Sequence, residues 1–471
     1  NSLQLEQTVF AASLVGDTES FVNLPGGPIG FATGIEWREE KATAKYDSWQ
    51  LGVIPAGSPF AAGTLLEEHS DNSNLVFRPQ LGNKSESGKY DTTDVFLEVS
   101  LPLLSDLPFV RELTVDAAGR IADYSTIGNS TSWKTSMVWA PIDDLAFRGS
   151  LSQAVRAPNI TELFGPAIGQ NYRPNDPCDA AQITALASDQ PGLAANYQSN
   201  CVTSLQAIGV DPFDSSGNYA FADPLSASFG GVAGGNRNLT EETADTITYG
   251  LVYQPNFLEG LSFTIDYWEI EIEDAISSVS AQDIVDGCYK EKALNGAFCN
   301  LFTRNADSSS MQHGGFNFLT STDINFANLE TSGIDLALSY DFSIGAHNFG
   351  ATVQGTKVNE IDFYTNPADL NEVNPELGEI LRPEEAGNVY LSWDYGDINV
   401  SFQSQYLGEM LLGTIEIETA DTLYGKKVFM DETWIHNISA SYNYSDEVTL
   451  YGGIRNLNEE DPFMTENAFP T

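Results

Sequence analysis

The chain of 471 residues carries 21 lysines and arginines against 66 aspartates and glutamates, a formal net charge of −45. Nucleic-acid binding needs a basic surface that neutralises phosphates, so this charge excludes it. Aromatic residues make up 11% and charged residues only 18%, which argues against a disordered chain. No apolar run is long enough for a membrane helix, and the 40 glycines suit a large all-β body.

The acidic excess has two interpretations. The first is a solvated acidic surface, adapted to a salty medium that contains calcium. In the second, loop carboxylates hold calcium ions, which prefer oxygen ligands. No spacing of the EF-hand kind is present, so calcium is assigned to no residues. No other metal site or cofactor is expected.

Apolar and polar residues alternate with a period of two, and this pattern predicts β-strands. Between positions 133 and 139, for example, Trp133, Met137 and Trp139 share one face while Lys134 and Ser136 share the other. The same alternation occurs in segments 145–152, 261–268, 334–342, 398–403 and 437–444. We expect about fourteen strands on this pattern.

The connections between these strands alternate between short and long. The short ones are 141–144, 255–260, 343–346, 395–397 and 445–447. The long ones, rich in small and polar residues, lie at about 157–243, 275–325, 357–385 and 408–430. Transmembrane barrels have this asymmetry, with tight periplasmic turns and large extracellular loops. A soluble β-sandwich, the alternative, rarely carries so many long loops at one end.

Aromatic residues near the short turns agree with a membrane barrel. Trp139, Tyr253, Trp393 and Tyr444 stand where an interfacial girdle would lie. In a sandwich, the same residues would be ordinary core aromatics.

The four cysteines form two local pairs, Cys178 with Cys201 and Cys288 with Cys299, each inside one loop-like segment. Four cysteines allow three connectivities, and pairing of nearest neighbours is the simplest of them. A zinc site would need metal-ligand spacing such as C-x-x-C, which is missing. Two disulfides are therefore predicted, in an oxidising compartment.

Several segments resemble the barrel of TonB-dependent outer-membrane receptors. The clearest is the strand that ends in Arg-Ala-Pro-Asn-Ile-Thr-Glu-Leu-Phe at 156–164. After a long loop, Gly-Asn-Arg-Asn-Leu-Thr-Glu-Glu at 235–242 is similar to a second element of that family. Further matching segments follow in the family's order or lie at the front of the chain: 24–38, 266–268, 330–335 and 451–457.

The resemblance implies an all-β fold, a transmembrane antiparallel barrel with about 22 strands in the complete protein. A plug domain and the TonB box that binds TonB should precede the barrel, and neither is recognisable in these residues. The final strand with its terminal aromatic residue is also missing. Since the chain begins at Asn1 without a signal segment, we expect residues 1–471 to be the C-terminal part of a longer barrel protein.

The function that the resemblance implies is active uptake of a bulky, scarce nutrient across the outer membrane of a Gram-negative bacterium. The TonB complex would be reached through the missing N-terminal region. Outer-membrane lipids and lipopolysaccharide would surround the barrel, its loops would be extracellular, and a surface lipoprotein is a further candidate partner.

The transported ligand is a ferric siderophore or an oligosaccharide on this interpretation. Haem receptors of the family supply a histidine from the loop after the Arg-Ala-Pro element. The histidines here are His69, His313, His347 and His436, and all lie outside that loop, which disfavours haem. Many siderophore complexes are anionic, so the net charge of −45 leans toward neutral sugars.

Five loop aromatics are candidate ligand contacts, because their rings can stack on a sugar: Tyr172, Tyr197, Phe213, Tyr219 and Phe229. The alternative role, packing the loop against its neighbours, is the commoner one for any single residue.

Three charged residues on the strands are expected to face the barrel interior: Arg156, Asp266 and Asp335. Charges inside a membrane protein usually have partners, and a polar lumen can accommodate them. We therefore assign these residues to a polar network of the lumen and not to ligand contacts.

Other classes of function fit less well. The chain has no Gly-x-Ser-x-Gly elbow, no phosphate loop and no histidine-based metal motif, so an enzyme is not expected. A passive porin is an alternative, but it would end in a complete closing strand. A surface adhesin or assembly protein on a barrel base is another alternative.

Overall fold

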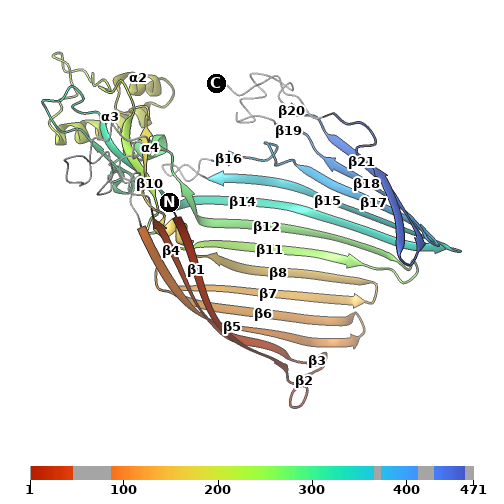
Figure 1. Cartoon of the computed structure of the whole chain (residues 1–471). Coiled ribbons are helices and arrows are strands. Elements are labelled where there is room, and N and C mark those ends of the chain that lie inside the picture. Colours follow the sequence, from red (N-terminus) through yellow and green to blue (C-terminus); the bar gives the residue numbers. More distant parts are fainter. Residues whose placement is uncertain (1, 46–85, 365–372, 412–428, 462–471) are drawn as a thin grey trace, which may run out of the picture.

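The computed structural model describes residues 2–45, 86–364, 373–411 and 429–461. Its main feature is an 18-stranded sheet that curves into an open trough (Figure 1). Four of these strands are short (β9, β10, β13 and β16), which leaves 14 long strands within the described ranges. The all-β fold class is confirmed, and the expected fourteen strands correspond to the long ones, with the short strands additional to the expectation.

The long strands follow one another as hairpins. They are β1 (Ser2–Asp17), β4 (Gly30–Lys45), β5 (Glu86–Leu107), β6 (Val110–Tyr124), β7 (Gly128–Ile142), β8 (Leu145–Arg156), β11 (Glu242–Tyr253), β12 (Leu261–Ser278), β14 (Phe316–Ile344), β15 (His347–Tyr364), β17 (Glu385–Tyr395), β18 (Ile398–Leu407), β21 (Thr433–Ser445) and β22 (Val448–Ile454). Each pairs antiparallel with the next, from β1 with β4 to β21 with β22.

The register places apolar and polar residues on opposite faces, as the alternation predicts. Leu151 on β8 pairs with Ile247 on β11, and both side chains remain exposed on the outward face. One position earlier, Ser150 pairs with Thr248 on the inner face, and their hydroxyls hydrogen-bond at 2.7 Å. An outward apolar face and an inward polar face are what a barrel in lipid needs.

Tight turns close the strands at one end of the sheet. Gly260 precedes β12, and its φ of 86° is in the left-handed region that favours glycine. A side chain there would also overlap the backbone oxygen of Asp341. Two short strands, β2 (Asn23–Leu24) and β3 (Gly27–Pro28), form a small hairpin in the connection from β1 to β4.

The expected loops need correction, because strands extend into three of the four. β12 runs to Ser278 and β14 begins at Phe316, so less of 275–325 is loop than predicted. β15 continues to Tyr364, inside the expected loop 357–385, and β16 (Asn374–Pro375) pairs with it. In 408–430, β19 (Met410–Leu411) pairs with β20 (Phe429–Met430), and residues 412–428 lie outside the described ranges. These strands continue because their backbone N–H and C=O groups still bond to the neighbouring strand where apolar and polar residues no longer alternate regularly.

The segment between β8 and β11 contains helices and strands of its own. It contains α1 (Ile160–Phe164), β9 (Ile168–Tyr172), α2 (Ala180–Asp189), α3 (Pro191–Ala207) and β10 (Phe229–Gly234). Between β12 and β14 lie α4 (Ala281–Tyr289), α5 (Gly296–Cys299) and β13 (Phe302–Arg304). Throughout the described part of the chain, every helix is too short or too polar to cross a membrane.

Candidate functional site

The two longest loops fold together into one small domain at the long-loop end of the sheet. Figure 1 shows α2, α3, α4 and β10 gathered there. One apolar cluster joins them, with Leu205 from the first loop and Ile284, Tyr289 and Phe302 from the second. Asn200 on α3 donates to the backbone oxygen of Tyr289 at 2.8 Å. We call this unit, residues 165–235 and 279–322, the loop domain.

The strand β14 belongs to both the loop domain and the barrel wall. Its first residues pair with β13 and, in parallel, with β10, as in the pairing of Leu319 with Gly231. Its later residues pair with β12 and β15 in the wall. Since one continuous strand runs through both parts, the loop domain is fixed to the wall by backbone hydrogen bonds.

Two disulfides cross-link this domain. Cys178 is bonded to Cys201 and Cys288 to Cys299, which confirms the nearest-neighbour pairing. The first bridge ties Cys178, two residues before α2, to the middle of α3, and both of its cysteines are fully buried.

A buried ion pair lies at the centre of the same core. The guanidinium of Arg304 donates to both carboxylate oxygens of Asp176 at 2.7 Å, and to the hydroxyl of Tyr289 at 2.9 Å. The Arg304 side chain is 3% exposed and that of Asp176 is fully buried. Burial alone would lower the pKa of Arg304, but Asp176 and Tyr289 together more than offset this and raise it. The pair joins the first loop to the second, and the sequence offered no signal for it.

The Arg-Ala-Pro element forms a clamp at the rim of the wall. Arg156 donates to Glu242 on β11 at 2.5 and 2.7 Å, and to Glu162 on α1 at 3.1 Å. Asn159 caps α1, and the Glu162 carboxylate accepts from the Asn159 backbone N–H in return. This is a capping box, which satisfies the free amides at the start of the helix.

The clamp holds α1 against the inner wall of β4 and β5. Ile160 and Leu163 are buried there beside Tyr90. Phe164 lies directly over Gly88, and Arg237 stacks on its ring at 5.1 Å. The motif residues therefore connect the rim of β8 and β11 with residues of β4 and β5.

A second set of charges lies lower on the inner wall. Arg148 on β8 forms an ion pair with Asp266 on β12, with 2.6 Å between Nη2 and Oδ2. Asp266 pairs in the register with Asp335 on β14, whose carboxylate accepts from the Thr356 hydroxyl at 2.6 Å. Asp266 and Asp335 thus come together, while Arg156 lies at the rim. Arg148 was not among the candidate site residues, although it shares the inward face with Arg156 by alternation.

The candidate ligand aromatics of the loops are mostly packed. Tyr197 and Phe229 are buried in the core of the loop domain. The hydroxyls of Tyr172 and Tyr219 donate to the backbone oxygens of Val232 and Cys178. Phe213 is 36% exposed and meets Tyr219 edge to face at 6.1 Å. These contacts favour the packing role over ligand stacking for every member except Phe213.

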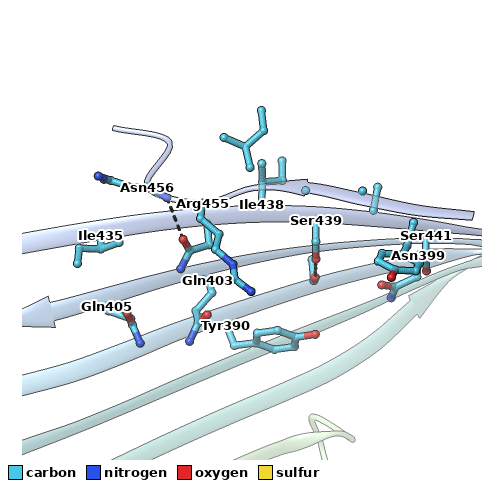
Figure 2. Close-up of a pocket in the computed structure, with 17 residues that line it drawn as sticks. Tyr390, Asn399, Gln403, Gln405, Ile435, Ile438, Ser439, Ser441, Arg455 and Asn456 are labelled. Carbon is cyan, nitrogen blue, oxygen red and sulfur yellow. Dashed lines mark hydrogen bonds between the residues drawn. The ribbon is translucent and has the colours of Figure 1, made fainter. Parts of the chain in front are cut away.

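The inner faces of β17, β18 and β21, beside β22, form a groove of about 860 Å³. Figure 2 shows Gln403, Ser439 and Tyr390 on one side of these strands and Ile438 on the other. Asn437 pairs with Gln403 in the register, and its amide oxygen accepts from the backbone N–H of Asn456 at 3.0 Å. Most side chains that line this face are amides and hydroxyls.

Among the residues that the structure describes, side-chain geometry gives no support for metal binding. Within the described ranges, no group of three or more histidine, cysteine, aspartate or glutamate side chains is arranged to hold a metal ion. Of the four histidines, His69 lies outside the described residues, and His347 accepts at Nδ1 from the indole of Trp393.

Comparison with known proteins gives the family. The family model for the β-barrel of TonB-dependent receptors matches residues 7–457. The chain therefore belongs to the TonB-dependent receptor β-barrel family. Such receptors are transporters and not enzymes, and the chain is an outer-membrane protein.

Two solved structures show the same barrel fold. The siderophore receptor PirA from Acinetobacter baumannii is 15% identical, with a TM-score of 0.56 over 97% of this chain and 51% of that chain. A mutant of the ferric enterobactin receptor PfeA from Pseudomonas aeruginosa is 14% identical, with a TM-score of 0.58 over 97% and 48%. The chain thus spans about half the length of these receptors.

Proposed function

We propose that the protein containing this chain is a TonB-dependent transporter that takes up a ferric siderophore across the outer membrane. The observation that carries the proposal is a cross-linked loop domain fixed to a polar inner wall through β14, in a chain of this family. The similar structures named as siderophore and ferric enterobactin receptors favour a ferric complex as the ligand.

In this proposal, the loop domain meets the ligand outside the cell, and the inner wall lines the path below. Phe213 supplies an exposed ring at the domain surface. Arg156, Asp266 and Asp335 belong to a polar lumen network that keeps the wall in shape. Arg156 pairs with Glu242 and Asp266 with Arg148, and the Asp335 carboxylate accepts from the Thr356 hydroxyl.

The partners follow from the same function. TonB would supply energy through a plug and coupling box, and lipopolysaccharide would contact the outward face. A surface lipoprotein is a further candidate that could deliver or retain the ligand, and bound calcium in the acidic loops would be structural.

Oligosaccharide uptake is a second candidate. The groove of β17, β18 and β21 offers mainly uncharged amides and hydroxyls, which suit sugar hydroxyls as well as siderophore oxygens.

Growth under iron limitation tests the proposal. Deletion of the gene from its host should abolish growth on one class of ferric siderophore as the sole iron source, and the intact gene should restore it. Unchanged growth on every ferric siderophore, together with lost growth on an oligosaccharide, would move the second candidate to first place. Passive entry of small solutes would instead indicate a porin, and lost surface attachment an adhesin.

A further inference from the structure

A histidine belongs to the aromatic girdle on the outward face of the wall. Thr356 faces the interior beside Asp335, so His347, an odd number of residues earlier in the regular part of β15, faces outward. Its ring centroid lies 4.4 Å from that of Tyr395 and 5.9 Å from that of Trp393, and the three rings are nearly parallel. Since His347 follows a short turn, this stack lies where the lipid meets the periplasm.

The bond from Trp393 decides which nitrogen of His347 carries the proton. The indole N–H of Trp393 donates to Nδ1 of His347 at 3.1 Å. An indole nitrogen can only donate, so Nδ1 is the acceptor and Nε2 carries the proton of the neutral imidazole. Among the described residues, neither Nε2 nor the hydroxyl of the half-exposed Tyr395 has a hydrogen-bond partner. Two donors on firmly stacked rings are thus available at the membrane boundary.

The acidic side chains of the neighbouring strands are kept away from these donors. Asp341 on β14 pairs with Gly350 on the inner face, and the Asp394 carboxylate on β17 accepts from the Asn399 amide at 2.8 Å, also on the inner face. Asp397 lies in the turn that follows β17. In a chain with a net charge of −45, the outward surface at His347 therefore lets an anionic group approach.

Apolar side chains surround the two donors and continue toward the membrane interior. Ile344 and Ile398 are exposed and pair in the register with His347 and Tyr395. Further along the same face, the rings of Phe342 and Phe349 stack with 5.0 Å between their centroids. Hydrogen-bond donors at the boundary, followed by an apolar surface, match a molecule with a polar head and apolar chains.

We propose that His347 and Tyr395 form a binding site for the phosphate head group of a glycerophospholipid in the periplasmic leaflet. Nε2–H and the tyrosine hydroxyl donate to the phosphate oxygens, and the acyl chains lie along Phe349 and Phe342. Donation to a charged oxygen makes a stronger hydrogen bond than donation to water, which favours phosphate over solvent at these donors. The inference concerns the lipid around the barrel and does not depend on the transported ligand.

Native mass spectrometry of the delipidated full-length receptor in detergent tests the inference. The probes are phosphatidylglycerol, a diacylglycerol with the same acyl chains but no phosphate, lipopolysaccharide and inorganic phosphate. The unmodified protein should retain a molecule of phosphatidylglycerol under conditions that remove the diacylglycerol. Inorganic phosphate should not displace that molecule, because it lacks the acyl chains that contact the apolar surface.

A double variant locates the site. His347→Phe with Tyr395→Phe keeps both rings and removes both donors, so it should weaken the retention of phosphatidylglycerol about tenfold and leave diacylglycerol unaffected. Tyr444→Phe is the matched control, because it removes the exposed hydroxyl of a tyrosine near another short turn. This control should retain phosphatidylglycerol within about twofold of the unmodified protein. Heat-modifiable gel mobility verifies that each variant is folded.

Unchanged retention of phosphatidylglycerol in the folded double variant would overturn the inference. Equal weakening in Tyr444→Phe would also overturn it, because the effect would then belong to any girdle hydroxyl. Equal retention of diacylglycerol by the unmodified protein would show that apolar contacts alone hold the lipid. Displacement by inorganic phosphate, or stronger retention of lipopolysaccharide through the same two donors, would assign the site to another phosphate source and contradict the proposed phospholipid.

Discussion

Arg148 on β8 binds Asp266 on β12 across the whole width of the intervening strand β11, with Nε 2.7 Å from Oδ1 and Nη2 2.6 Å from Oδ2. Gly250 of β11 stands between them and pairs in the register with both. A Cβ atom on residue 250 would overlap the Asp266 carboxylate. The ion pair therefore depends on the absence of a side chain at this position.

A side chain at position 250 should thus destabilise the barrel. Gly250→Ala pushes the Asp266 carboxylate away from Arg148. The substitution should lower the free energy of unfolding by about 1 to 3 kcal/mol. The measurement is the urea concentration at which the protein loses its heat-modifiable gel mobility. Gly119→Ala is the control, because a Cβ there meets open space. Equal shifts for both variants would contradict this account of Gly250.

The clamp of Arg156 makes a separate prediction about the first loop. Arg156→Gln removes the charge that joins Glu162 on α1 to Glu242 on β11. Local opening of α1 should become easier by about 1 to 3 kcal/mol, seen as faster proteolysis between residues 157 and 243. Arg111→Gln, which breaks exposed ion pairs with Asp106 and Asp143 at the turn end, is the comparison. If both variants are cleaved at the unmodified rate, the clamp has no role in holding the loop.

Reduction of the disulfides should loosen the loop domain. The bridge between Cys178 and Cys201 closes a loop with a sequence separation of 23. Loss of this bridge should lower the free energy of unfolding of the loop domain by about 3 kcal/mol, because the unfolded chain without the bridge has more conformational entropy. Reduced protein and Cys178→Ser should both show faster cleavage within 165–235, while the barrel strands keep their gel mobility. Protease sensitivity that does not change on reduction would contradict the stabilising role.

Asp286 should make the loop domain sensitive to pH. Burial raises the pKa of this carboxyl on α4, although Gln282 donates to it at 3.0 Å. Because the folded state then holds the proton more tightly than the unfolded state, ionisation costs stability. The cost is absent below the ordinary aspartate value of about 4 and grows as the pH rises through the raised pKa.

Asp286→Asn should therefore slow hydrogen exchange in the loop domain at neutral pH, and the difference from the unmodified protein should vanish near pH ~4. Asp307→Asn is the control of opposite sign. Hydrogen bonds from Ser309 lower the pKa of Asp307, so the ionised carboxylate stabilises the folded state. Replacing this carboxylate with an amide should speed hydrogen exchange at neutral pH. Faster exchange in Asp286→Asn at neutral pH would show that the ionised carboxylate stabilises the domain.

The barrel wall was predictable from the sequence because strand alternation is local. Ser150 and Leu151 are neighbours in one strand, so their side chains must point to opposite faces of the sheet. The structure places them on opposite faces. The disulfides were predictable for a similar reason, since both partners of each pair lie in one segment. The capping box from Asn159 to Glu162 is also readable as a short motif.

The loop domain was not predictable in the same way. Asp176 and Arg304 are separated by 128 residues, and neither position shows that two loops share one core. The ring of Tyr197 could equally have been exposed, and the core that the two loops build together buries it. Strand β14 likewise continues past the rim because β10 and β13 pair with it. The sequence of β14 alone does not reveal these pairing strands.

The most direct test of the central claim is energy-dependent uptake by cells that carry the full-length protein. A labelled ferric siderophore that the purified protein binds is supplied, and its accumulation is compared with and without TonB and the proton gradient. The proposal predicts surface binding in both cells and accumulation in the energised cells alone. Equal accumulation without TonB and with a collapsed gradient would contradict active transport and indicate a passive channel.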